Sequence, residues 1–181
     1  DDILAIKSYL DSLEQIEQVA QENQLNFPFN QRWGMFFWNM LFLDDKQFQT
    51  EAQHSSEWNR GKYLVEGPGH CGECHSPRNL FQAVSKDRSL AGNLIQGWNA
   101  YNISSDPING VGAWPTDVLA RYLKDGAAPG FGLSTGPMAE VVEHSLSHLT
   151  DADRHAIAVY LKDSPARSEG VARPQQAKLA P

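Results

Sequence analysis

Five consecutive residues carry the clearest chemistry in this sequence. Cys71-Gly72-Glu73-Cys74-His75 places two thiols three positions apart and an imidazole directly after the second thiol. This Cys-x-x-Cys-His spacing is the attachment signature of c-type haem. The thiols can add to the two vinyl groups on one side of a porphyrin, and the imidazole can then bind the iron. The motif therefore predicts one covalently attached haem c, held by Cys71, Cys74 and His75.

Three other interpretations of the two cysteines stay open at this point. A redox-active Cys-x-x-Cys pair of the thioredoxin type needs a βαβ context, and the pattern of the chain gives none. A zinc site could use Cys71, Cys74, His75 and His70, although adjacent residues rarely bind one metal together and no second cysteine pair exists. A disulfide across two intervening residues is strained. Covalent haem is the interpretation that the Cys-x-x-Cys-His spacing favours.

A haem iron bound by His75 has a second axial position, which a methionine or histidine fills or which stays open. Met138 follows Gly136-Pro137 and lies 63 residues after His75, far enough along the chain to reach the opposite face of a haem. We therefore expect His75 and Met138 to be the two iron ligands. Methionine ligation would raise the reduction potential, and a filled sixth position would disfavour binding of oxygen or peroxide. The alternatives for the second ligand are Met35, Met40, His144 and His148.

The segments around the candidate haem-binding residues are predicted to be helices. Short helices are expected over residues 58–65, 118–123 and 138–146, where apolar residues recur at helical spacing and glycines or prolines mark the ends. Between them, residues 91–113 and 126–137 are rich in Gly and Asn and show no alternating strand pattern. Loops of this length in a small domain usually wrap something or serve a site. The predicted fold class is all-α.

An internal similarity relates the two ends of the chain. Residues 2–10 and 153–161 share Asp, Ala, Ile, Tyr and Leu at five of nine aligned positions. The shared apolar residues fall at i, i+1, i+4 and i+5, which is one face of a helix. Thr150, three residues before Asp153, resembles a capping box, so the later copy is expected to end near residue 163. Either two amphipathic helices coincide in pattern, or residues 1–13 are the final helix of a preceding, missing domain of the same type.

Composition sets the limits on function. The 181 residues are 41 % apolar with a net charge of −7, and residues 1–54 hold nine acids against three bases. No basic stripe is present, so nucleic acid is not an expected partner. The longest apolar run, residues 35–43, is far below the roughly 20 residues of a membrane span. We expect membrane association only through partners or a missing segment. The absence of an initiator Met and a leader indicates a processed or truncated product.

The remaining segments differ sharply in composition. Residues 14–54 read as a linker with an aromatic helix at 27–43, where seven of the 18 aromatic residues gather. That helix is expected to begin near Gln31 and to pack against the haem domain, against a partner, or as the core of an N-terminal extension. Its expected buried stripe is Trp33, Phe36, Phe37, Met40 and Leu41. Residues 164–181 hold three prolines and no aromatic residue, and they read as a disordered tail or linker.

Residues 55–163 resemble a class I cytochrome c domain. The closest likeness is to the second haem domain of the multihaem cytochrome c subunits of membrane-bound alcohol and sugar dehydrogenases. The resemblance rests on residues 58–79, Gly97-Trp98, Asn102-Ile103, residues 136–142 and residues 149–153. Residues 27–42 resemble the segment that joins the first two haem domains of such subunits, and residues 1–13 resemble the end of the first domain. One haem motif stands here where such subunits carry three.

The resemblance implies roles for matching residues. It implies a class I cytochrome c fold around one haem, with Met138 as the distal ligand. Pro77 would help set the His75 side of the haem, Arg78 would face a propionate, and Trp98 would pack near the haem edge.

The implied function is electron transfer rather than catalysis. The haem would pass single electrons between a periplasmic dehydrogenase subunit, or another cytochrome domain, and a downstream acceptor. Because haem attachment in such proteins is completed outside the bacterial cytoplasm, a periplasmic or periplasm-facing location is expected. The alternative is a haem enzyme or ligand sensor, such as a peroxidase, with an open sixth coordination site.

Overall fold

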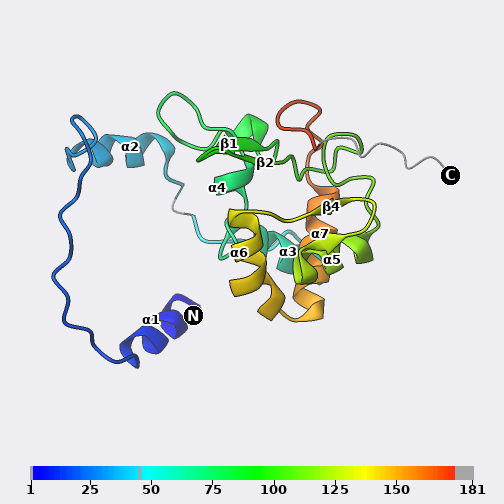
Figure 1. Ribbon diagram of the computed structural model, residues 1–181, viewed down its shortest axis with the longest axis horizontal. Helices are drawn as coiled ribbons and strands as arrows, with labels where there is room; N and C mark the ends of the chain where they lie inside the picture. Colours follow the sequence, from blue (N-terminus) through cyan, green and yellow to red (C-terminus); the bar gives the residue numbers. More distant parts are fainter. Residues whose placement is uncertain (1, 45, 174–181) are drawn as a thin grey trace. The chain divides into compact units, whose positions relative to one another are not determined.

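The chain forms two compact units in a computed structural model, Asp1–Asp45 and Lys46–Pro181, and the structure describes residues 2–44 and 46–173. Helices dominate both units, and the strands are short (Figure 1). In the described ranges, no helix has both the length and the apolar character that crossing a bilayer requires.

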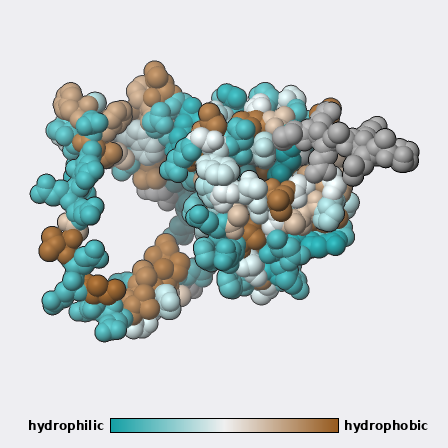
Figure 2. Space-filling model, viewed as in Figure 1, coloured by the Kyte–Doolittle hydropathy of each residue, from teal (hydrophilic) through white to brown (hydrophobic). Residues whose placement is uncertain are grey.

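The first unit contains helices α1 (Asp2–Asp11) and α2 (Gly34–Phe42). Helix α2 begins three residues later than predicted, because residues 27–33 form successive turns closed by bonds such as Gln31 N to Pro28 O (3.0 Å). Proline and asparagine in this stretch favour turns over helix. Figure 2 shows hydrophobic side chains along both helices. The predicted stripe of α2 is exposed, so its burial against a haem domain or a partner stays a prediction.

The second unit holds the helices expected from the sequence. They are α3 (Ser56–Glu66), α5 (Thr116–Asp125), α6 (Pro137–His144) and α7 (Asp151–Asp163). The single turn α4 (Gly72–His75) and the 3-10 turns at Lys86–Arg88 and Leu146–His148 were not predicted. Ser55 and Thr150 begin α3 and α7 by accepting hydrogen bonds from Trp58 N and Asp153 N, each at 3.0 Å. These caps satisfy backbone donors that the first turn of a helix leaves free.

Helices α3 and α7 form the most extensive packing contact of the second unit. Their backbones meet at Gly61, where an added Cβ would lie 2.0 Å from the carbonyl oxygen of Ala156. Beside this point the rings of Trp58 and Tyr160 pack edge to face, with centroids 5.1 Å apart. The missing side chain at Gly61 therefore sets how closely the two helices approach.

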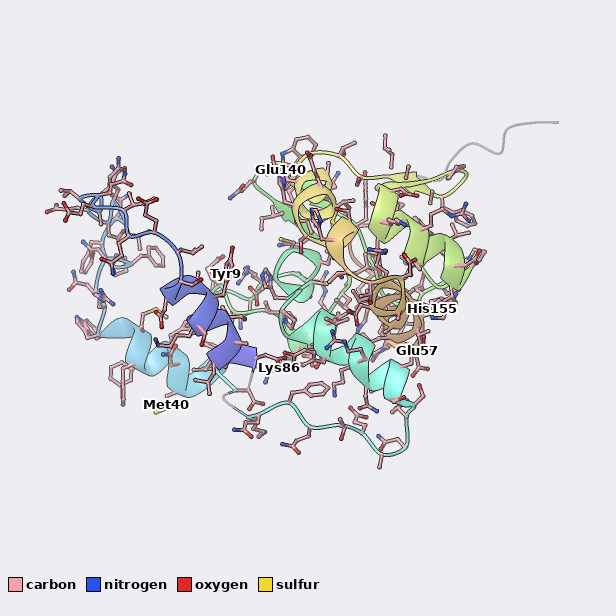
Figure 3. All side chains as sticks on the ribbon, turned by 90° about the horizontal axis from the view of Figure 1, so that it is seen from below. Tyr9, Met40, Glu57, Lys86, Glu140 and His155 are labelled. Atoms are coloured by element: carbon pink, nitrogen blue, oxygen red, sulfur yellow. The ribbon has the colours of Figure 1, made fainter. Side chains whose placement is uncertain are left out.

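Polar pairs flank the same crossing on its solvent side. His155 Nδ1 lies 2.6 Å from Glu57 Oε1, and both side chains can be followed between α7 and α3 (Figure 3). Arg60 donates from Nε to Asp153 Oδ1 at 2.7 Å. The Arg60 hydrogen bond lowers the pKa of Asp153 below its ordinary value. The pairs therefore connect α3 to the first two turns of α7.

Helix α5 packs on α7 and completes one apolar core. The buried residues of this core include Leu64 and Val65 from α3, Trp114 just before α5, Leu119, Tyr122 and Leu123 from α5, and Ile157, Ala158 and Leu161 from α7. Cys71 and Met138 are partly buried against this core.

The fold is rich in helix, in line with the all-α prediction, and contains two small hairpins that the prediction did not include. Strands β1 (Asn93–Ile95) and β2 (Trp98–Ala100) pair antiparallel, as do β3 (Ala127–Ala128) and β4 (Gly132–Leu133). Gln96 and Gly97 join the first pair with positive φ angles of 51° and 82°, as a two-residue hairpin turn requires. Strands of two or three residues are too short to show an alternating pattern, so they could not be predicted from the sequence.

The segment after α7 also differs from the sequence prediction of a disordered tail or linker. Residues 165–173, called the C-terminal strap below, are bound to the loop at 91–104. Val171 N donates to Ala91 O (3.0 Å), and Asn102 N donates to Val171 O (2.7 Å). Arg167 N donates to Ser104 Oγ at 3.0 Å. A proline-containing segment without aromatic residues is thus held by backbone hydrogen bonds, which composition does not reveal. Residues 174–181 lie outside the described part of the chain.

Candidate functional site

The two cysteines lie on one helical turn. Cys71 precedes α4 and is joined to the end of α3 by a hydrogen bond from its N–H to Val65 O (3.0 Å). His75 N donates to Cys71 O at 3.0 Å, which closes the turn. Side chains three positions apart on such a turn lie on the same side. Both thiols are free, with Cys71 partly buried and Cys74 exposed. Burial raises the pKa of the Cys71 thiol to about 11.

The imidazole of His75 is oriented by a backbone carbonyl. Its Nδ1 lies 2.6 Å from Tyr101 O, which accepts the Nδ1–H hydrogen bond and leaves the Nε2 lone pair available to a metal. Burial lowers the pKa of His75 to about 4, so the ring is neutral at neutral pH. Gly92 N also donates to His75 O at 2.7 Å. The loop around β1 and β2 therefore fixes both the backbone and the ring of His75.

The loop that carries Met138 meets the same hairpin. A Cβ on Gly136 would lie 2.7 Å from the indole atoms of Trp98, so glycine lets the backbone lie directly against this ring. Gly136 also has a φ of 55°, which other residues rarely adopt. Met138 follows as the second residue of α6 and is partly buried against the core. Trp98 thus connects the hairpin that holds His75 to the start of α6.

The alternative second ligands occupy different surroundings. Met35 and Met40 belong to the first unit, where both side chains are exposed. His144, at the end of α6, and His148 are exposed as well. Met138 is the candidate that packs against the same core as Cys71. Its binding to iron remains a prediction.

The three supporting residues named from the sequence are placed as follows. Pro77 accepts a hydrogen bond from Ser85 N (2.9 Å), which ties down the loop that follows His75. Arg78 donates to Glu73 Oε2 (2.6 Å) and Gln82 O (2.7 Å), so carboxylate and carbonyl groups of this chain already surround its guanidinium. Trp98 is 48 % exposed, with its ring against Gly136. Their roles toward a haem stay predictions.

Sequence reasoning missed two residues at this site. Tyr101 acts through its backbone carbonyl, so its side-chain type carries no signal of this role. Arg173 places its guanidinium carbon 5.3 Å from the centre of the Tyr101 ring. It belongs to a segment whose composition predicted disorder. The adjacent pair Asn102-Ile103 was the nearest available signal, because it formed part of the resemblance to cytochromes c.

The arrangement fits a covalent haem c. Two free thiols share one turn, a neutral imidazole presents Nε2, and a methionine packs nearby on the same core. Over residues 2–44 and 46–173, no three His, Cys, Asp or Glu side chains gather in a way that would hold a metal ion. His75 and Met138 would offer one nitrogen and one thioether, a pair of donors that a haem iron accepts.

Comparison with known proteins points the same way, although no protein-family model matches the chain. It is 38 % identical over 171 residues to the fructose dehydrogenase cytochrome subunit of Gluconobacter japonicus, covering 93 % of this chain and 35 % of that protein. It is 38 % identical over 177 residues to the gluconate 2-dehydrogenase cytochrome c subunit of Pantoea cypripedii, covering 92 % and 40 %. A diheme cytochrome c-type protein of Cereibacter sphaeroides is 39 % identical over 167 residues, covering 91 % and 54 %.

The chain is similar to cytochrome c subunits of bacterial dehydrogenases. The resemblance recognised in the sequence is confirmed by these matches, which extend over nearly the whole chain. The chain spans between about a third and about a half of the length of these three curated relatives. The similarity extends over nearly the whole chain, and the roles of individual site residues stay predictions.

Proposed function

We propose that this chain is an electron-transfer cytochrome c module with one haem c, attached to Cys71 and Cys74 and ligated by His75 and Met138. The observation that carries the proposal is the Nδ1–H hydrogen bond of His75 to Tyr101 O (2.6 Å), next to two free thiols on one turn. That bond fixes the tautomer and orientation that an iron ligand needs. The bound haem would supply the redox chemistry by alternating between Fe(III) and Fe(II).

The protein's part in this function is to hold and surround the cofactor. The thiols anchor it, the Tyr101 carbonyl orients His75, and the contact of Gly136 with Trp98 positions the start of α6. Partial burial of Met138 and Cys71 against the apolar core lowers the local dielectric. Burial and methionine ligation both favour the reduced state and so raise the potential.

Electron transfer is favoured over the alternative of an open-site haem enzyme or ligand sensor. An open site requires that Met138 not bind the iron, whereas Met138 is partly buried against the same core that Cys71 contacts. The relatives are cytochrome subunits of dehydrogenases. We therefore infer an electron carrier within an oxidoreductase complex rather than a catalytic subunit.

The partners follow from the same similarity. The relatives' names pair them with fructose and gluconate dehydrogenases. We infer that this chain accepts electrons from a dehydrogenase subunit or another cytochrome domain and passes them to a downstream acceptor. Because haem attachment is completed outside the bacterial cytoplasm, we infer a periplasmic or periplasm-facing location for this module.

The first unit has its own place in the proposal. Helix α1 shares the apolar pattern of α7, and that apolar face is exposed. We infer that residues 1–13 act as the final helix of a preceding cytochrome c domain and that residues 14–54 link it to the haem domain at 55–163. The relatives exceed this chain in length, which leaves room for such a domain.

The deciding experiment measures covalent haem. The protein is produced with a haem-attachment system, and intact mass and absorbance are recorded. We expect the mass of one haem and the weak far-red band of a methionine–iron bond in the oxidised form. The double variant Cys71→Ala with Cys74→Ala should lose all covalent haem, whereas His70→Asn, next to the motif, should keep it. A colourless protein would refute the proposal, and a high-spin spectrum would favour the open-site alternative.

A further inference from the structure

Arg173, the last residue of the C-terminal strap, lies over three aromatic rings. Its guanidinium carbon is 4.9 Å from the ring centre of Trp114, 5.3 Å from that of Tyr101 and 5.7 Å from that of Tyr122. Trp114 and Tyr122 are buried in the core. These distances are within the range of cation–π attraction. The cation is thus held at the edge of the apolar core rather than in open solvent.

The guanidinium lacks a complete set of hydrogen-bond acceptors. Within the described residues, Nε of Arg173 is buried and has no acceptor. Two other arginines of this unit are paired with carboxylates of the chain, Arg78 with Glu73 and Arg154 with Asp151, whereas Nε of Arg167 is buried without an acceptor as well. A buried guanidinium N–H without an acceptor is costly, and the guanidinium fork binds carboxylates best. Arg173 is therefore arranged to receive a carboxylate that the described chain does not supply.

Tyr101 links this cation to the haem-binding residues. Its ring lies under Arg173, and its carbonyl oxygen accepts the hydrogen bond from His75 Nδ1. A haem bound through His75 carries two propionates. Either of these carboxylates could be the partner that Arg173 lacks within the described chain.

Hydrogen bonds of the strap hold Arg173 at this place. Val171, two residues earlier, donates to Ala91 O (3.0 Å) and accepts from Asn102 N (2.7 Å). Asn102 is fully buried, and its Nδ2 donates to Arg167 O at 2.7 Å. Since Asn102 directly follows Tyr101, the strap and the carbonyl that orients His75 belong to one hydrogen-bonded assembly.

We propose that Arg173 binds a haem propionate and raises the reduction potential of the haem. This inference rests on the proposed function. The fixed positive charge of Arg173 destabilises the ferric state relative to the ferrous state, because the ferric haem carries one more positive charge. Arg173 is thus a positioning and electrostatic residue that acts on the cofactor from the C-terminal strap.

The test is a redox titration of the haem-loaded protein at a fixed pH. Arg173→Gln removes the charge, Arg173→Lys keeps it, and Arg121→Gln is the matched control, since Arg121 is an exposed arginine on α5 paired with Asp117. We expect a lower midpoint potential for Arg173→Gln, with at least partial recovery in Arg173→Lys and no change in Arg121→Gln. The methionine–iron band and the melting temperature should stay close to those of the unchanged protein in all three variants.

Each other outcome counts against the proposal. An unchanged potential in Arg173→Gln overturns it while leaving the proposed function intact. An equal fall in the Gln and Lys variants, together with loss of the methionine–iron band, shows a structural role for the strap and also overturns it. A protein that carries no covalent haem overturns the proposed function and this inference together.

Discussion

Helices α1 and α7 share a sequence pattern but differ in the burial of their apolar side chains. In α7, Ile157 and Leu161 are each 3 % exposed. Their counterparts in α1, Ile6 and Leu10, are 56 % and 57 % exposed. The tyrosines differ in the same way, at 8 % for Tyr160 and 65 % for Tyr9. Both segments are helices of ten or more residues, so the local pattern acts equally in both.

The difference teaches that an apolar face predicts a contact without supplying one. Helix α7 meets α3, whose Gly61 lets the two backbones approach closely. Within the described residues of the first unit, no residue of α1 is buried. Exposed apolar side chains in a regular row mark surfaces that bind another element or chain. This exposed face is the physical ground for our proposal that α1 belongs to a neighbouring domain.

The largest expected effect separates Met138 in the second unit from Met35 in the first. Met138→Ala should keep the haem attached through Cys71 and Cys74 but abolish the methionine–iron band and lower the potential. Cyanide or carbon monoxide should then bind faster, because the sixth position is open. Absorbance spectroscopy and stopped-flow mixing measure both changes. Met35→Ala should leave the spectrum unchanged. An unaltered spectrum in Met138→Ala would transfer the ligand role to Met35, Met40, His144 or His148.

The second prediction tests the burial contrast directly. Ile157→Ala should lower the free energy of unfolding by about 2–5 kcal/mol, because it empties a packed site in the core. Ile6→Ala, the matching change in α1, should alter it by less than about 0.5 kcal/mol. Denaturant titration followed by circular dichroism measures both. Equal destabilisation by the two variants would show that α1 is buried as deeply as α7.

The third prediction concerns the helix crossing. Gly61→Ala should destabilise the second unit by about 1–3 kcal/mol, since the new methyl group meets the Ala156 backbone, which cannot swing away. Gly34→Ala in α2 meets no atom within 4 Å and should leave the melting temperature of the second unit unchanged. If thermal unfolding of Gly61→Ala matched that of the unchanged protein, the close approach of α3 and α7 would be wrong.

The smallest expected effect is a pH dependence from Asp153. The Arg60 hydrogen bond lowers the pKa of Asp153, so the stability it contributes is present above the carboxyl's ordinary range and is lost as pH falls below about 4. Because the Arg60 side chain is about half exposed, this contribution should stay below about 1 kcal/mol.

Melting temperatures across this pH range measure the effect. The curves of Asp153→Asn and the unchanged protein should differ at neutral pH and converge in acid. Asp11→Asn, in the exposed pair with Lys7 on α1, is the control and should not alter unfolding of the second unit. Parallel curves at all pH values would assign the stabilisation to something other than the ionised carboxylate.

Most helices of the second unit could be predicted from the sequence. The helical stripes predicted α3, α5, α6 and α7, because a face that repeats every 3.6 residues is written in neighbouring positions. The hairpin at 93–100 was missed because three-residue strands show no period. The strap at 165–173 was missed because its stability comes from hydrogen bonds to residues more than sixty positions away.

By itself, the sequence determined the chemistry: Cys71, Cys74 and His75 form a motif whose spacing suits one cofactor, and local spacing needs no tertiary contact to be recognised. Only the tertiary structure decided how that chemistry is held. The carbonyl of Tyr101 orients His75, and Arg173 arrives over Tyr101 from the far end of the chain. Backbone carbonyls have the same chemistry in every residue, and contacts between distant segments depend on packing. Neither feature leaves a local pattern in the amino-acid sequence.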